Sequence, residues 1–195
     1  YIFFGDLEAD DVIAYCVHKL SGNKITIISN DYDFLQLIPK AKIITRNFMF
    51  GFSEETDRFY LSQRFLKSNY YLYPGNCFQI YKILIGDKGD NIPSSLKSYR
   101  KTNILQKIYS PENKDKLKEI NSINDFTFDD FKNFVKEFKL EEVVDLEQAE
   151  LNYKLISLSF NNIKNFVNDF PVEKHLISAI QLHSLMSNKK MLFSL

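Results

Sequence analysis

The first third of the chain alternates between apolar stripes at helical spacing and short β-branched runs. Over residues 8–20 the apolar positions recur three and four residues apart behind an acidic start, which predicts an amphipathic helix. Residues 25–29 form a β-branched run of the kind found in strands buried on both faces of a parallel sheet. A short helix over 33–37, ended by Pro39, and a second strand over 42–45 follow. This order predicts an α/β layer fold.

The rest of the chain shows helical patterns separated by polar loops. The expected helices cover residues 76–85, 103–109, 128–138, 147–157 and 172–186. Phenylalanines keep close to helical spacing in the third of these, and such a stripe indicates core packing. The sequence contains no internal repeat and no long low-complexity linker. We therefore expect half of an α/β domain over residues 1–70 that continues into a helical domain over residues 71–195.

Composition narrows the class of protein. Among 195 residues, 25 Lys and Arg balance 25 Asp and Glu, so bulk charge gives no argument for a nucleic-acid partner. Cys16 and Cys77 lie far apart and outside any Cys-x-x-Cys pair, which argues against a zinc site or a disulfide framework and fits a reducing cytosol. No apolar run approaches the roughly 18 residues that a membrane span needs. Because the chain opens at Tyr1 inside an expected strand, we expect the C-terminal part of a longer protein.

Carboxylates concentrate in three short segments. The first lies at a predicted helix start, the second just past the carboxyl end of a predicted strand, and the third in a polar loop after an apolar helix. Their seven members are Glu8, Asp10, Asp11, Asp31, Asp33, Asp87 and Asp90. Each segment also has a simpler explanation. The first group can complement a helix dipole, Asp31 can form an Asx-turn, Asp33 can cap the next helix, and the loop residues can be solvated.

Taken together, the three segments predict a cation site. Ligands of open α/β sheets bind outside the carboxyl ends of the strands, where Asp31 and Asp33 fall. Carboxylates that converge there repel one another unless they take up protons or hold cations. Oxygen ligands without nearby His or Cys favour Mg²⁺ or Mn²⁺ over zinc. Such a site suits phosphoryl chemistry, in which two ions about 3.5–4 Å apart hold the attacking and leaving oxygens.

The three segments also resemble successive acidic motifs of the 5′ nuclease (flap endonuclease) superfamily. The matching stretches read EADDVI over 8–13, SNDYDFLQL over 29–37 and IGDKGDNIP over 85–93. This superfamily includes the 5′–3′ exonuclease domain of bacterial DNA polymerase I and phage 5′ exonucleases, and the resemblance is closest to phage members of the ribonuclease H type. It implies the C-terminal part of a PIN-like parallel-sheet nuclease domain. A helical domain of the helix–turn–helix type would follow, with the acidic loop 86–91 completing the active site.

The resemblance implies roles for the carboxylates and for two Mg²⁺ ions, which Mn²⁺ could replace. Asp31, similar to a residue that approaches both metal sites, and Asp87 are the expected catalytic carboxylates. The first metal site would be held by Glu8 and Asp10 with Asp11 beside them, and the second by Asp33, Asp87 and Asp90. Metal-bound hydroxide attacks the phosphodiester in this superfamily, so no Ser, Cys or His nucleophile is needed. We accordingly interpret His18 as packing on the polar face of its helix, and find no acidic pattern around His175 or His183.

Two features of the superfamily are missing from the sequence. Further metal-binding Asp residues and a basic arch come from upstream of the first motif, so the chain alone is expected to lack a complete first metal site. Cellular members follow the third motif with a glycine-rich helix–turn–helix, whereas residues 94–102 contain no glycine.

A local basic cluster gives the best candidate surface for nucleic acid. It consists of Lys97, Tyr99, Arg100, Lys101 and Lys107. Lysines there could hold a duplex backbone, although a solvated helix face would have the same composition. The chain has few arginines, which argues against base-specific contacts. The apolar stretch 190–195 could dock in a sliding clamp or simply pack as a chain end.

These features predict a divalent-metal-dependent 5′→3′ exonuclease or flap endonuclease. Its substrates would be 5′ ends or flaps of DNA and RNA–DNA hybrids, as in the removal of RNA primers during phage DNA replication. We expect a cytoplasmic monomer that has no membrane contact. A sliding clamp and a single-strand DNA-binding protein are candidate partners, which the sequence does not decide. The alternatives are an inactive DNA-binding scaffold of the same fold, a PIN-type ribonuclease, and the nuclease domain of a DNA polymerase I.

Overall fold

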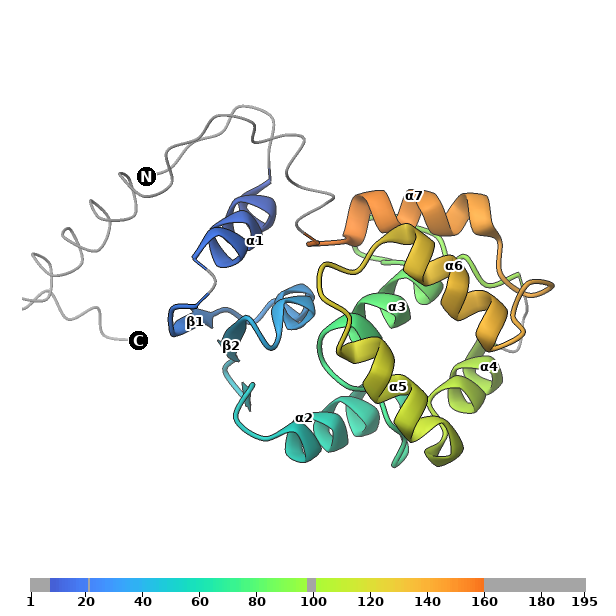
Figure 1. The fold of residues 1–195 in the computed structure, drawn as a ribbon, viewed down its shortest axis with the longest axis horizontal. Coiled ribbons are helices and arrows are strands. Elements are labelled where there is room, and N and C mark those ends of the chain that lie inside the picture. Colours follow the sequence, from blue (N-terminus) through green and yellow to red (C-terminus); the bar gives the residue numbers. More distant parts are fainter. Residues whose placement is uncertain (1–7, 21, 98–100, 160–195) are drawn as a thin grey trace, which may run out of the picture.

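The structure is a computed structural model that describes residues 8–20, 22–97 and 101–159 (Figure 1). Helix α1 (Ala9–Lys19) is followed by strand β1 (Ile25–Ile28), the 3₁₀ helix η1 (Tyr32–Leu37), and strands β2 (Ala41–Ile44) and β3 (Met49–Phe50). Next come α2 (Glu54–Leu61), the π-helical turn η2 (Ser62–Leu66) and α3 (Asn76–Ile85). The last part contains α4 (Lys101–Ile108), η3 (Pro111–Asn113), α5 (Lys114–Asn121), α6 (Phe128–Glu137) and α7 (Leu146–Ile156).

The sheet has three short strands in the order β1-β2-β3. Strands β1 and β2 are parallel, with Ile27 opposite Ile43, and both were predicted. The antiparallel strand β3 was not predicted, because two residues are too short to show a strand pattern. The prediction that the first strand is buried on both faces is wrong. Burial alternates along β1, and Ile28 is 81% exposed, so within the described residues one face of this strand is open.

The helices gather beside the sheet around the apolar helix α3 (Figure 1). Helix α3 is buried along almost its whole length and packs against α7, α5 and η1. The buried amide of Asn152 on α7 donates to the carbonyls of Ile83 and Pro93, both at 2.8 Å. Because these carbonyls flank residues 86–91, α7 fixes the ends of the acidic loop.

Four of the five expected later helices are confirmed as α3, α4, α6 and α7, whereas the fifth, 172–186, lies outside the described residues. Helices α2 and α5 were not predicted. One hydrophobic cluster joins α1, the sheet and the helices, so the described chain has a continuous core. A mixed α/β architecture with a small sheet and many helices agrees with the expected fold class, and the helix–turn–helix arrangement and the boundary near residue 70 stay predictions. Among the described helices, none combines the length and the apolar character that crossing a bilayer requires.

Candidate active site

The second acidic segment forms the start of η1, directly after β1. The carboxylate of Asp31 accepts a hydrogen bond of 2.9 Å from the backbone N–H of Asp33, so the Asx-turn offered above as a simpler explanation for Asp31 is present. The simpler explanation for Asp33 is wrong, since Asp31 and not Asp33 occupies the N-cap position. Because Asp33 does not cap the helix, its side chain can point into the protein, where it is partly buried.

The third acidic segment is a tight loop at the end of α3. Asp87 and Ile92 exchange backbone hydrogen bonds of 2.9 and 2.7 Å across the loop. Gly86 has a φ of 75°, and a Cβ at this position would lie 2.3 Å from the carbonyl oxygen of Ile92, so only glycine fits. The Oδ1 atom of Asp87 accepts from the N–H of Gly89 at 2.8 Å. These contacts hold the Asp87 carboxylate against the end of α3.

Lys82 joins the two segments. Its ammonium lies 2.7 Å from Oδ1 of Asp33 and also donates to Oδ2 of Asp87. The lysine side chain is only 12% exposed, and it extends from α3, which packs against η1. Two carboxylates from distant parts of the sequence therefore share the ammonium of Lys82 near the carboxyl end of β1.

The charges of this trio depend on one another. Burial raises the pKa of Asp33, and the charge of Lys82 opposes this effect. The hydrogen bond from Lys82 lowers the pKa of Asp87. Burial alone would lower the pKa of Lys82, but the two carboxylates outweigh it and raise that pKa. The lysine thus stays charged, and it compensates only one of the two carboxylates.

Two carboxylates of the predicted metal site converge on the ammonium of Lys82. Asp33 and Asp87 supply hard oxygen atoms, already converge on a positive charge, and have Asp31 near enough to raise the pKa of Asp33. The Lys82 ammonium occupies the position between them. Within the described residues, no three His, Cys, Asp or Glu side chains are arranged to hold a metal ion. A complete site therefore needs movement of Lys82 or further ligands.

The first acidic segment forms a separate group at the start of α1. Glu8 is the N-cap residue and makes no side-chain capping hydrogen bond. Burial, together with the charges of Asp10 and Glu8, raises the pKa of Asp11. Asp90 is exposed in its loop. The metal-binding roles of all seven carboxylates stay predictions.

The structure describes only part of the expected basic cluster. Lys97 is exposed beside the bridge that pairs Leu96 with Val144, and Lys101 and Lys107 lie on α4. Tyr99 and Arg100 lie outside the described residues, as do His175, His183 and the stretch 190–195. Nucleic-acid binding by this cluster remains a prediction.

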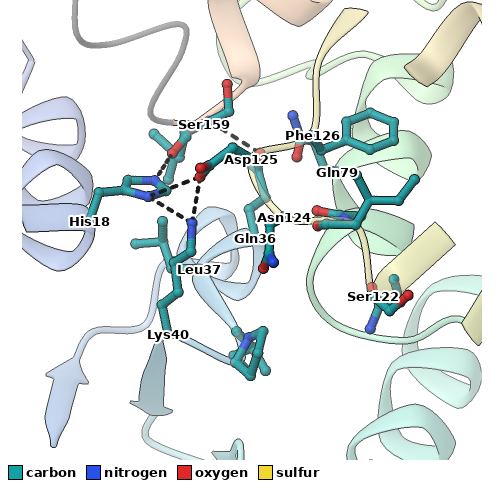
Figure 2. A pocket seen from close by; sticks show the side chains of 16 residues that line it. His18, Gln36, Leu37, Lys40, Gln79, Ser122, Asn124, Asp125, Phe126 and Ser159 are labelled. Carbon is teal, nitrogen blue, oxygen red and sulfur yellow. Dashed lines mark hydrogen bonds and ion pairs between the residues drawn. The ribbon is translucent and has the colours of Figure 1, made fainter. Parts of the chain in front are cut away.

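His18 lines a cavity of about 120 Å³ between α1, η1 and the segment after α5 (Figure 2). One ring nitrogen, Nε2, lies 2.9 Å from the Leu158 carbonyl and the other, Nδ1, lies 3.0 Å from the ammonium of Lys40. Lys40 also contacts Asp125 at 2.8 Å. Burial lowers the pKa of His18, so its ring is neutral, and Lys40 donates to Nδ1. His18 thus links α1 to the segment that follows α7, a tertiary role beyond the expected polar-face packing.

Sequence reasoning missed Lys82, which now stands at the centre of the site. It lies in an apolar helical stripe, where a lone lysine is usually read as a solvent-facing residue. The sequence did offer one signal. Lys82 lies five residues before Asp87, close enough along the chain for the two side chains to meet at the end of the helix.

Two curated proteins are similar to this chain. A 5′-3′ exonuclease from Aquifex aeolicus (strain VF5) is 33% identical over 155 residues, covering 77% of this chain and 45% of that protein. A DNA polymerase I from Caldicellulosiruptor bescii is 34% identical over 127 residues, covering 60% of this chain and 14% of that protein. The similarities support a relationship with the 5′ nuclease superfamily. No protein-family model matches the chain, and no solved structure matches it. The chain spans less than half the length of either relative.

Proposed function

We propose that this chain is part of a divalent-metal-dependent 5′→3′ nuclease that hydrolyses phosphodiesters of DNA and of RNA–DNA hybrids. The observation that supports the proposal is that the carboxylates of Asp33 and Asp87 meet at the ammonium of Lys82, near the carboxyl end of β1. Similarity to a named 5′-3′ exonuclease and to a DNA polymerase I supports the same reaction class.

Residues of this chain would hold the ion. Asp33 and Asp87 would bind Mg²⁺ or Mn²⁺, with Asp31 beside them, and the Gly89 N–H keeps the Asp87 carboxylate in place. A bound divalent ion supplies Lewis-acid activation of water and neutralises charge on the phosphodiester. Lys82, displaced from between the carboxylates, would remain close enough to place its ammonium against a phosphate oxygen.

The proposal also covers the type of nuclease, its biological role, a second metal ion and its partners. They include closeness to the T-even phage ribonuclease H, removal of RNA primers in phage replication, a second metal ion at the start of α1, and partnership with a sliding clamp and a single-strand DNA-binding protein. Completion of the first metal site and of the basic arch would come from sequence upstream of this chain.

Cleavage assays on the full-length protein test the reaction and its polarity. Blunt DNA, 5′-flapped DNA and RNA–DNA hybrid duplexes, labelled at the 5′ or the 3′ end, would be incubated with Mg²⁺, Mn²⁺ or EDTA. We expect short products from the 5′ end with either metal and intact substrate in EDTA. Degradation from the 3′ end, or equal cleavage in EDTA, would contradict the proposal.

A further inference from the structure

An ordered aromatic group lies beside the candidate site. Tyr32, between Asp31 and Asp33 in the sequence, packs edge-on against Phe50 and Phe65 with ring centroids 6.1 and 5.7 Å away. Its hydroxyl oxygen lies 3.2 Å from that of Tyr60, which stacks on Phe48 at 4.2 Å. The tyrosine ring is thus held in one orientation by neighbours from β3, α2 and η2.

Arg64 rests on this ring. Its guanidinium carbon lies 4.4 Å from the Tyr32 centroid and 5.8 Å from that of Phe65. The side chain is exposed, and in the part of the chain that the structure describes no carboxylate lies within ion-pair distance of it. Stacking uses the face of the guanidinium and leaves the N–H donors at its edge available.

Arg58, on α2, shows what a structural arginine looks like in the same protein. It is 7% exposed, and its donors reach Glu55 at 2.9 Å, Asn69 at 3.0 Å and the Tyr70 carbonyl at 2.6 Å. The Nε and Nη1 groups of that guanidinium are therefore both used inside the fold. Among the described residues Arg64 has no comparable set of hydrogen-bond partners, and its guanidinium stacks on the rings of Tyr32 and Phe65 instead.

The backbone at Arg64 is also unusual. Ser62–Leu66 forms a π-helical turn that ends in a left-handed Lys67 with a φ of 58°. Such turns widen a helix locally and occur often at functional sites. Here the widened turn carries Arg64 at its centre, while Leu66 remains buried in the core.

We propose that Arg64, seated on Tyr32, binds a backbone phosphate of the nucleic-acid strand that is cleaved at the neighbouring carboxylates. The inference rests on the proposed nuclease function and extends it to a residue outside the expected basic cluster. Asp31 and Asp33 repel an approaching phosphate backbone, so a fixed cation at the edge of the same segment helps to place the strand. A guanidinium whose edge is free and whose face is stacked suits phosphate oxygens, which accept paired N–H donors.

Binding without cleavage tests the inference. Full-length wild-type protein and an Arg64→Ala variant would be titrated with fluorescent 5′-flapped DNA in EDTA over a series of salt concentrations. Loss of one phosphate contact should weaken binding severalfold and reduce the slope of log affinity against log salt by about 0.7–0.9. Arg64→Lys keeps the charge and should retain the slope. The matched control, Lys136→Ala, removes an exposed positive charge from α6 and should leave affinity and slope unchanged.

Variants of Tyr32 test whether its ring positions Arg64. Tyr32→Phe keeps the ring and should bind like wild type, whereas Tyr32→Leu should reproduce the Arg64→Ala defect and add nothing to it in the double variant. Circular dichroism would check folding, and if Tyr32→Leu is unfolded, the Arg64 variants decide alone. Wild-type affinity and slope in Arg64→Ala would overturn the inference and leave the nuclease proposal standing. Wild-type protein that binds no nucleic acid would overturn both.

Discussion

At the scale of single residues, Lys82 determines the charge of the candidate site. It lies between Asp33 and Asp87, and its removal would leave two partly buried carboxylates facing each other without compensation. We expect Lys82→Met to lower the free energy of unfolding in EDTA by about 2 kcal/mol, a figure reduced from fully buried pairs because the carboxylates are partly exposed.

Millimolar Mg²⁺ should restore much of that loss, because an ion that binds only the folded variant stabilises it by mass action. Urea unfolding with EDTA and with Mg²⁺ measures both effects, and Lys136→Met on α6 controls for the loss of one exposed lysine. Equal stability of wild type and Lys82→Met in EDTA, with no response of the variant to Mg²⁺, would show that Lys82 does not hold these carboxylates together.

At the scale of elements, the sequence predicted the helices and strands whose apolar pattern is long and regular. Helices α1, α3, α6 and α7 carry sustained apolar stripes, and β1 and β2 are β-branched runs. Helix α2 was missed because its sequence is mostly polar, although Ser53 provides an N-cap that accepts from Thr56. The π-helical turn could not be foreseen, since it depends on how Phe65 and Leu66 pack rather than on local propensity.

The junction of β3 and α2 depends on Asp57. Its side chain is buried, Oδ2 accepts from the Gly51 N–H at 2.7 Å, and within the described chain Oδ1 has no partner. Burial raises the pKa of this carboxyl to about 6, against the weaker opposing effect of the Gly51 hydrogen bond. The folded state therefore binds the proton more tightly than the unfolded state, and Asp57 costs stability as the pH rises through its folded pKa.

Asp57→Asn removes this titration and keeps an oxygen for Gly51. Relative to wild type, the variant should gain about 2–3 kcal/mol of unfolding free energy between about pH 4 and about pH 7. Chemical denaturation across this range measures the difference, and Asp115→Asn on α5 corrects for loss of one exposed carboxylate. A difference between Asp57→Asn and wild type that is independent of pH would contradict the buried, titrating carboxyl.

At the scale of the whole molecule, the fold brings together segments that the sequence shows only as separate motifs. The sequence predicted that carboxylates follow β1 and α3, but not that Lys82 would join Asp33 to Asp87, because the packing of α3 on η1 decides that contact. The start of α1 remains a separate acidic group in the described structure. The metal site predicted there stays a prediction.

The rate of 5′-end cleavage by full-length Asp33→Asn and Asp87→Asn variants in Mg²⁺ decides whether these two carboxylates bind a catalytic metal ion. Each substitution keeps the side-chain shape and removes a negative oxygen ligand, so cleavage should fall by at least roughly 100-fold, as the loss of several kcal/mol of metal-assisted stabilisation requires. Lys136→Ala should cleave at the wild-type rate. Wild-type cleavage by both Asp variants would contradict the assignment of this carboxylate pair to a phosphodiester-cleaving metal site.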